Sequence, residues 1–144
     1  MINLWPPYIG AGIRVKNINE KRTRFEVTTR HTFRNKNLFG TQFGGSLYAM
    51  VDPFYAFILV LNLGEDYIVW DKSASIDFVS PGRSKVTAII EITEDEIEKI
   101  KKEVNMIGKN TYHFSANVVD KDLNIVAKVN KELYVRYKKF EKNK

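Results

Sequence analysis

Ser46 to Leu63 reads SLYAMVDPFYAFILVLNL, and this stretch decides the fold. Its only charged residue is Asp52, and its uninterrupted apolar run, Phe54–Leu61, is far shorter than the ~20 residues that a membrane span needs. A helix that is apolar on almost every side is instead buried by protein. We therefore expect a long central helix enclosed by the rest of the chain, and no membrane as a partner.

Segments with the alternation typical of β-strands lie on both sides of this helix. Apolar and polar residues alternate at positions 13–15, 25–27, 67–79, 86–92, 112–118 and 125–135. A second, amphipathic helix begins at a capping box formed by Thr93 and Glu96 and ends at Gly108. Because strands and helices do not alternate regularly, the sheet is expected to be antiparallel. The sequence predicts one α+β domain over residues 1–144, with an antiparallel sheet wrapped around the central helix.

The strand expected at residues 67–79 has one irregular position. Simple alternation places five side chains on its inner face: Ile68, Trp70, Ala74, Ile76 and Phe78. Lys72 falls on that same face. It either forms an ion pair with Asp71 or Asp77 at the sheet edge or points into a pocket, and both interpretations stay open.

The central helix also predicts self-association. One sheet covers only one side of a helix that is apolar all round. The remaining side has to be covered by curvature of the sheet or by a partner subunit. We therefore expect at least a homodimer.

Composition excludes several classes of site. The 144 residues contain no cysteine, so disulfides, thiolate metal sites and a cysteine nucleophile are ruled out, and two isolated histidines give no metal-site spacing. Half of the net charge of +6 lies in the tail Lys138–Lys144, which we interpret as a solvated end. The mildly basic remainder suits a phosphate-bearing small molecule, and no nucleic acid is expected. The first residues lack the order of a signal peptide, so a cytoplasmic location is expected.

Two features at the start of the central helix could carry chemistry. Gly44 and Gly45 precede it, where the first backbone N–H groups lack partners within the helix and a ligand can approach closely. Such a terminus can hold an oxyanion. Asp52 is a carboxylate within an apolar helix, and burial would make that carboxylate a stronger proton acceptor, which suits a general base.

The spacing of these residues resembles a known motif. Asn37, Gly40, Gly44, Gly45 and Asp52 follow the pattern N-x-x-G-x-x-[H]-G-G with an acid seven residues beyond the second glycine. This pattern is similar to that of hotdog-fold thioesterases of the phenylacetate-pathway and 4-hydroxybenzoyl-CoA type. The stretches WPP, GTQFGGSLYAMVDPFY and YIVWDKSASIDF more closely resemble a hotdog branch known mainly as a domain of unknown function.

The resemblance implies hydrolysis of acyl-coenzyme A or a related acyl thioester. The backbone N–H of Gly44, beside Gly45, would polarise the thioester carbonyl, and Asp52 would act as nucleophile or general base. Asn37 would orient the substrate or the water, and Arg83 would contact coenzyme A phosphates. No cofactor is implied beyond the coenzyme A of the substrate. In that family the acid and the helix start usually come from different subunits, which implies a homodimer or a homotetramer.

The sequence also departs from the family pattern. Phe43, at the edge of the expected substrate site, stands where the family usually has histidine, and Ala56 replaces a hydroxyl of some members. Pro53 follows the acid directly and predicts a kink that frees the carbonyl of Ala49. These departures leave open a non-catalytic hotdog protein that binds acyl-CoA or an acyl carrier.

Structural interpretations of the same residues also stay open. Asp52 could be satisfied by backbone donors at the kink, and the glycine pair could serve close packing of the helix. Asn37 could cap a turn.

Overall fold

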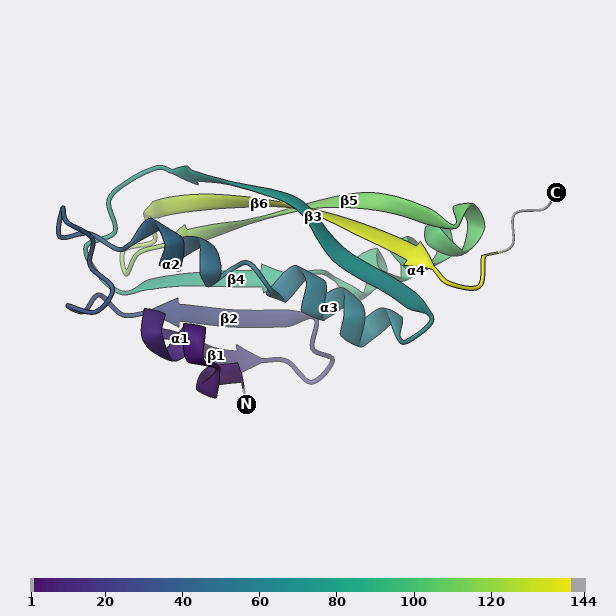
Figure 1. Ribbon diagram of the computed structural model, residues 1–144, viewed down its shortest axis with the longest axis horizontal. Coiled ribbons are helices and arrows are strands. Elements are labelled where there is room, and N and C mark those ends of the chain that lie inside the picture. The colour runs from purple at the N-terminus through teal and green to yellow at the C-terminus, as the bar shows by residue number, and fades with distance from the viewer. Residues whose placement is uncertain (1, 141–144) are drawn as a thin grey trace.

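The computed structural model describes residues 2–140, so residues 141–144 of the Lys-rich tail lie outside the described residues. It contains a six-stranded sheet and several helices, shown in Figure 1. The helices are η1 (Ile2–Leu4), α1 (Pro6–Ala11), α2 (Gly44–Ala49), α3 (Phe54–Leu63) and α4 (Glu94–Ile107). The strands are β1 (Ile13–Ile18), β2 (Arg24–Thr29), β3 (Tyr67–Phe78), β4 (Val86–Glu91), β5 (Lys109–Val119) and β6 (Ile125–Tyr137).

The sheet has the order β1-β2-β4-β5-β6-β3, and every neighbouring pair is antiparallel. Figure 1 shows the sheet curving around α2 and α3, with α4 at the end of the sheet near the C-terminus. The expected α+β architecture, with an antiparallel sheet around a central helix, is therefore confirmed. β3 is at one end of the strand order, so one of its edges has no neighbour within the described chain.

The central helix is interrupted at the position of the proline. α2 ends at Ala49, residues 50–53 form a turn, and α3 begins at Phe54. Pro53 lacks the N–H that would bond the carbonyl of Ala49. The hydroxyl of Tyr8 from α1 donates to that carbonyl instead, at 2.9 Å. The predicted kink is confirmed, and it gives α1 a fixed attachment to the central helix.

Alternation along β4 and the capping of α4 also follow the sequence. The side chains of Val86, Ala88, Ile90 and Ile92 are all buried against the core. Thr93 and Glu96 form the capping box at the start of α4, and Gly108 ends the helix. The buried face of α4 consists of Ile97, Ile100 and Val104, as its helical spacing predicts.

The predicted face of β3 is wrong in its first half. A β-bulge between Asp71 and Ser73 shifts the register against β6. Before the bulge, Val69 pairs with Val135 and packs on the core, while Trp70 is 62% exposed on the outer face. Ile68 accordingly lies on the outer face with Trp70. A bulge inserts one residue and thereby exchanges the two faces of a strand, which simple alternation cannot anticipate.

The same bulge decides the environment of Lys72 and Asp71. Lys72 forms an ion pair with Glu132 on the outer face of the sheet, at 3.3 Å. The expected ion pair with Asp71 or Asp77 is therefore wrong, and so is the alternative that Lys72 points into a pocket. Asp71 pairs with the buried Leu133 and therefore faces the inside of the sheet.

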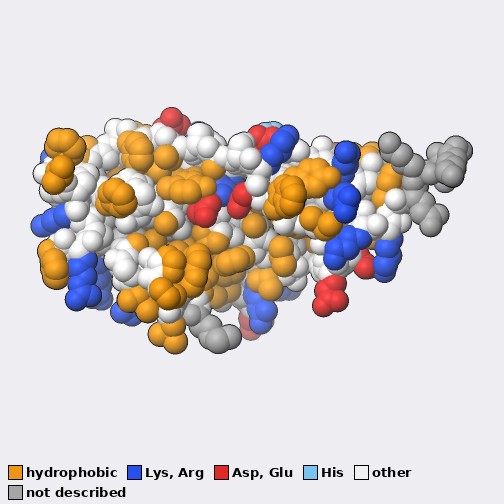
Figure 2. All heavy atoms as spheres, viewed as in Figure 1, with side chains coloured by type: hydrophobic (Ala, Val, Ile, Leu, Met, Phe, Trp, Pro, Cys, Tyr) orange, Lys and Arg blue, Asp and Glu red, His pale blue; other side chains and the backbone are white. Residues whose placement is uncertain are grey.

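One side of α3 remains uncovered in the single chain. Phe57, Val60 and Leu61 are 38%, 51% and 49% exposed, although the opposite side of the helix is buried. Figure 2 shows hydrophobic side chains spread over this face, with acidic side chains among them near its centre. By length and composition alone Gly44–Leu63 could cross a membrane, and half of this segment is buried inside the fold.

We expect Thr93→Ala to lower the free energy of unfolding by about 1 kcal/mol, because the N-cap oxygen that accepts from the Glu96 N–H is lost. Thr93→Ser keeps that oxygen and should stay near the wild-type value. Urea denaturation monitored by circular dichroism measures both. Equal stability of the alanine and serine variants would contradict the capping role.

Candidate active site

Asp52 lies in the turn between α2 and α3, and its side chain is 43% exposed. One of its carboxylate oxygens, Oδ1, accepts two hydrogen bonds. The Tyr48 hydroxyl donates at 2.5 Å and the Lys131 ammonium at 2.6 Å. No hydrogen bond within residues 2–140 reaches the other oxygen, Oδ2. The hydrogen bonds to the Asp52 carboxylate therefore come from side chains. The alternative from the sequence, in which backbone donors at the kink supply them, is wrong.

Lys131 is the central residue of this arrangement. It belongs to β6 and its side chain has no exposed surface. Its ammonium nitrogen lies 2.6 Å from Asp52 Oδ1, 3.0 Å from Asp71 Oδ1 and 3.2 Å from the Tyr48 hydroxyl. An ammonium has three donors, so all three are satisfied. We call Lys131, Asp52, Asp71 and Tyr48 the Lys131 cluster.

The electrostatics of the cluster keep the lysine charged. Burial by itself would lower the pKa of Lys131, but its hydrogen bonds to the two carboxylates and to Tyr48 outweigh burial, so this pKa is raised above the ordinary lysine value. Burial, followed by the hydrogen bond to Asp52, raises the pKa of Tyr48. Tyr8 is affected similarly, because burial and then the charge of Asp52 raise its pKa. Both phenols therefore remain neutral donors.

Two aromatic side chains lie close to the backbone at the start of α2. A Cβ at Gly44 would lie 2.9 Å from the ring of Phe78, and a Cβ at Gly45 would lie 2.6 Å from the ring of Phe43. A side chain at either position would displace an aromatic ring, and both rings end exposed side chains that can move aside. The packing interpretation of the glycine pair therefore stays open beside the oxyanion interpretation. Phe43 itself is 55% exposed beside this backbone.

Asn37 closes its own loop. Its Oδ1 accepts from the Phe39 N–H at 2.9 Å and from the Thr41 N–H at 3.1 Å, and its Nδ2 donates to Thr41 Oγ1 at 2.8 Å. This is the turn-capping role that the sequence left open. Nδ2 also lies 3.4 Å from the carbonyl of Gln42, so Asn37 is tied to the segment that enters α2.

Arg83 is exposed in the loop between β3 and β4. That loop contacts the entrance of α2, because the Gln42 N–H donates to the Gly82 carbonyl at 2.8 Å. Arg83 therefore belongs to the same end of the molecule as Asn37 and the glycine pair.

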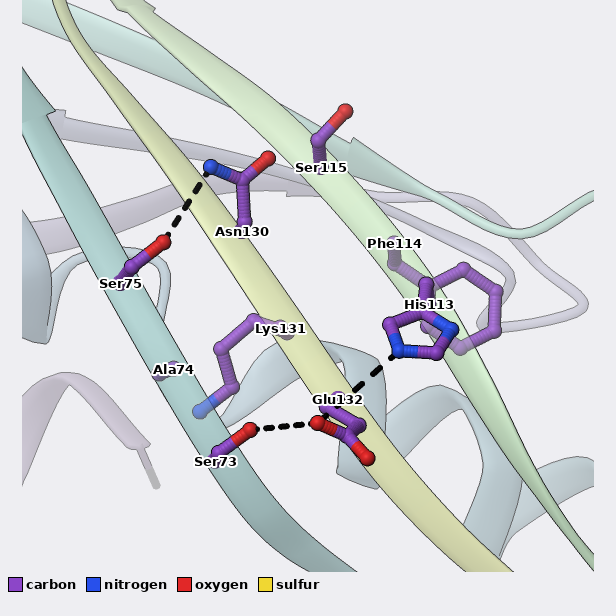
Figure 3. Close-up of a pocket in the computed structure, with 9 residues that line it drawn as sticks. All are labelled: Ser73, Ala74, Ser75, His113, Phe114, Ser115, Asn130, Lys131 and Glu132. Atoms are coloured by element: carbon purple, nitrogen blue, oxygen red, sulfur yellow. Dashed lines mark hydrogen bonds and ion pairs between the residues drawn. The ribbon is translucent and has the colours of Figure 1, made fainter.

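A second polar group lies on the opposite side of the sheet. Figure 3 shows Ser73, His113 and Glu132 on the outer side of β3, β5 and β6, while the Lys131 side chain extends to the other side. Ser73 Oγ donates to Glu132 Oε2 at 2.7 Å, and His113 Nε2 lies 3.9 Å from the same oxygen. In a nucleophilic triad the histidine must contact the serine. Here glutamate stands between them, so the group is not such a triad.

No group of three or more His, Asp or Glu side chains within residues 2–140 is arranged to hold a metal ion. The Lys131 cluster offers a carboxylate, a buried ammonium and a phenol hydroxyl. Such a carboxylate can accept a proton or attack an electrophilic carbon.

Three members of the Lys131 cluster were not identified as site residues from the sequence. Lys131 interrupts the apolar alternation between Val129 and Leu133, which was a visible signal. Tyr48 stands four residues before Asp52, a spacing that places two side chains on the same helix face. Asp71 had no such signal, because only the bulge turns it inward.

Solved structures share this fold at low sequence identity. The probable thioesterase PA5026 from Pseudomonas aeruginosa superposes with a TM-score of 0.76 at 16% identity, covering 88% of this chain and 84% of that chain. The thioesterase HI1161 from Haemophilus influenzae gives 0.68 at 18% identity, covering 97% and 89%. PaaI from the phenylacetic acid degradation operon of E. coli gives 0.66 at 19% identity, covering 93% and 86%. The chain has the hotdog fold of these proteins, as the sequence predicted.

No curated protein matches the sequence. A family model described as a domain of unknown function, DUF4442, matches residues 1–135, which is most of the chain. That match agrees with the branch of the hotdog superfamily indicated by the sequence. With the fold and this match together, the chain belongs to the DUF4442 family of hotdog proteins.

Proposed function

We propose that this protein hydrolyses acyl thioesters, with acyl-coenzyme A as the substrate class and Asp52 as the reacting carboxylate. The thioesterases among the structures of the same fold support a hydrolase of this general kind. The observation that carries the proposal is the hydrogen bonding and exposure of the Asp52 carboxylate. Its Oδ1 is fixed by Lys131 and Tyr48, while Oδ2 accepts no hydrogen bond from the described residues, and the side chain is 43% exposed.

Two routes use the free oxygen of Asp52. As a nucleophile, Oδ2 adds to the thioester carbonyl, the C–S bond breaks, and the resulting mixed anhydride is hydrolysed by water. As a general base, Oδ2 takes a proton from a water that adds to the carbonyl, and the proton then passes to the departing thiolate. Both routes release one carboxylic acid and one thiol, and both need Asp52 ionised.

An oxyanion donor at Gly44 requires a second copy of the chain. Gly44 opens α2 and Asp52 lies in the turn after it, so the six residues of α2, about 9 Å long at 1.5 Å per residue, separate the two groups. Both groups must come within about 3 Å of the reacting carbonyl. One chain therefore cannot supply both to the same carbonyl. We propose that the Gly44 N–H of one copy faces the Asp52 of another.

The uncovered surfaces of the chain support such an assembly. β3 has a free edge within the described sheet, and Phe57, Val60 and Leu61 of α3 are partly exposed. A soluble protein gains from burying contiguous apolar surface of this kind against a second copy. Arg83, at the end of the molecule where α2 begins, would then contact phosphates of coenzyme A, while Phe43 would line the substrate site and Asn37 would shape the loop beside it.

A non-catalytic acyl-binding protein is the second candidate. The observation that favours it is the aromatic cover over the start of α2, where Phe78 approaches Gly44 and Phe43 replaces the family histidine. Such a protein would bind the acyl thioester in the same place and leave it intact.

We expect wild-type protein to release thiol from at least one member of a panel of short, medium, long and aromatic acyl-CoAs. Asp52→Asn should lower kcat by ~10²–10⁴-fold, the range for loss of a general base. Because the chain has no cysteine, a thiol-reactive dye reports only released coenzyme A. Asp77→Asn is the matched control, since Asp77 is an exposed carboxylate of β3 that lies outside the Lys131 cluster.

Undiminished turnover by Asp52→Asn would rule out the proposed chemistry. Silence of the wild type across the whole panel, with ligand binding retained, would instead favour the acyl-binding protein.

We also expect a dimer or a larger assembly at micromolar concentration by multi-angle light scattering. Val60→Glu places a charge on the uncovered side of α3 and should shift the population toward monomer. Met106→Glu, at a 75% exposed position of α4, should leave the assembly intact. A wild-type monomer at this concentration would contradict the shared site.

A further inference from the structure

Two carboxylates, Asp52 and a second one, contact the buried ammonium of Lys131. Asp71 from β3 lies 3.0 Å from the Lys131 ammonium nitrogen, and its side chain is 37% exposed. The cluster therefore contains two carboxylates and one ammonium, with a net charge of −1 when all three are ionised. A β-bulge at Lys72 is what turns Asp71 toward this cation.

We propose that Lys131 and Asp71 are positioning residues that set the ionisation and the orientation of Asp52. This inference rests on the proposed thioester hydrolysis and adds two residues to it. Lys131 donates a hydrogen bond to Oδ1 of Asp52 and thereby leaves Oδ2 of Asp52 outside the hydrogen bonds of the Lys131 cluster. Asp71 competes for the same ammonium and so limits how strongly Lys131 stabilises the charge on Asp52.

Geometry supports separate roles for the two residues. Lys131 reaches Asp52 Oδ1 at 2.6 Å, a strong charge-assisted contact, and its third donor reaches the hydroxyl that also donates to that oxygen. Two hydrogen bonds converging on one oxygen fix the plane of the carboxylate. The interaction of Asp71 in this cluster is its ion pair with Lys131, so it acts on Asp52 through the ammonium and through its own charge.

Titratable side chains from four surrounding elements lie close enough to Asp52 to affect its ionisation. They are Tyr8 of α1, Tyr48 of α2, Asp71 of β3 and Lys131 of β6. The two tyrosines stay neutral because burial raises the pKa of each. The charged neighbours of Asp52 in this group are therefore Lys131, which favours its ionised form, and Asp71, which opposes it.

Opposite substitutions should move the pH dependence of turnover in opposite directions. Lys131→Met keeps the length of the side chain and removes the cation, so protonation of Asp52 becomes easier. The acidic limb of the kcat profile should then move up by about 1–3 pH units, the effect of one close charge. Asp71→Asn keeps an acceptor for Lys131 and removes the competing charge, so the limb should move to lower pH.

Matched controls come from the outer face of β3. Lys72→Met removes the same charge from a lysine whose partner is Glu132, and Asp77→Asn removes an exposed carboxylate. Neither should move the acidic limb. A merely structural role for Lys131 would lower activity at every pH and leave the position of the limb unchanged, which would overturn the inference.

A readout independent of turnover separates this inference from the proposed function. Carboxyl ¹³C NMR of aspartate-labelled protein, with Asp52 assigned by the loss of its signal in Asp52→Asn, follows protonation of Asp52 directly. Its midpoint should move up in Lys131→Met and down in Asp71→Asn, whether or not any thioester is hydrolysed. An unchanged midpoint in both variants would overturn the inference, whereas absent turnover with shifted midpoints would overturn only the proposed function.

Discussion

A lysine with no exposed side-chain surface stays charged inside a protein only when its three N–H donors all find acceptors. In this hotdog protein the acceptors of Lys131 come from two other elements of the fold. Asp52 and Tyr48 belong to the segment of the central helix, and Asp71 belongs to the edge strand β3. The ammonium of β6 thus joins the helix to the sheet at the point where the candidate chemistry lies. Misplacing any one of these elements would leave a buried charge without its partner.

Pro53 interrupts the central helix at the turn that holds Asp52. Pro53 ends the regular hydrogen-bond pattern of the helix, and Asp52 lies in the turn at residues 50–53 with its side chain partly exposed. The carbonyl that the proline leaves free is satisfied by Tyr8, which fixes the N-terminal helix against the same turn. The residues of α2 separate Asp52 from Gly44, and for this reason the proposed thioester site takes these two groups from two copies of the chain.

Much of this fold can be predicted from the sequence because its signals are local. The capping box of Thr93 and Glu96, the alternation of β4 and the kink at Pro53 each depend on residues close in the chain, and the structure confirms all three. The motif around Gly44 and Asp52 likewise indicated the fold family.

The inner face of β3 and the partners of Asp52 could not be predicted in the same way. A bulge of one residue reverses which side chains of β3 point inward, and nothing in simple alternation marks its position. Lys131 was visible as a charge between Val129 and Leu133, but its meaning depends on Asp71, which is far away in sequence and reaches it only through that bulge. Long-range pairing of this kind is a property of the assembled sheet.

The charge on Lys131 is the central claim of this account, and ¹⁵N NMR of the lysine side-chain nitrogen measures it most directly. Because its pKa is raised, Lys131 should keep the chemical shift of an ammonium as the pH rises past the ordinary lysine value of 10.5. The stability that it contributes should be fully present below that pH and should be lost only above it. A Lys131 nitrogen that becomes a neutral amine well below pH 10.5 would contradict the charged cluster and the role proposed for Asp52.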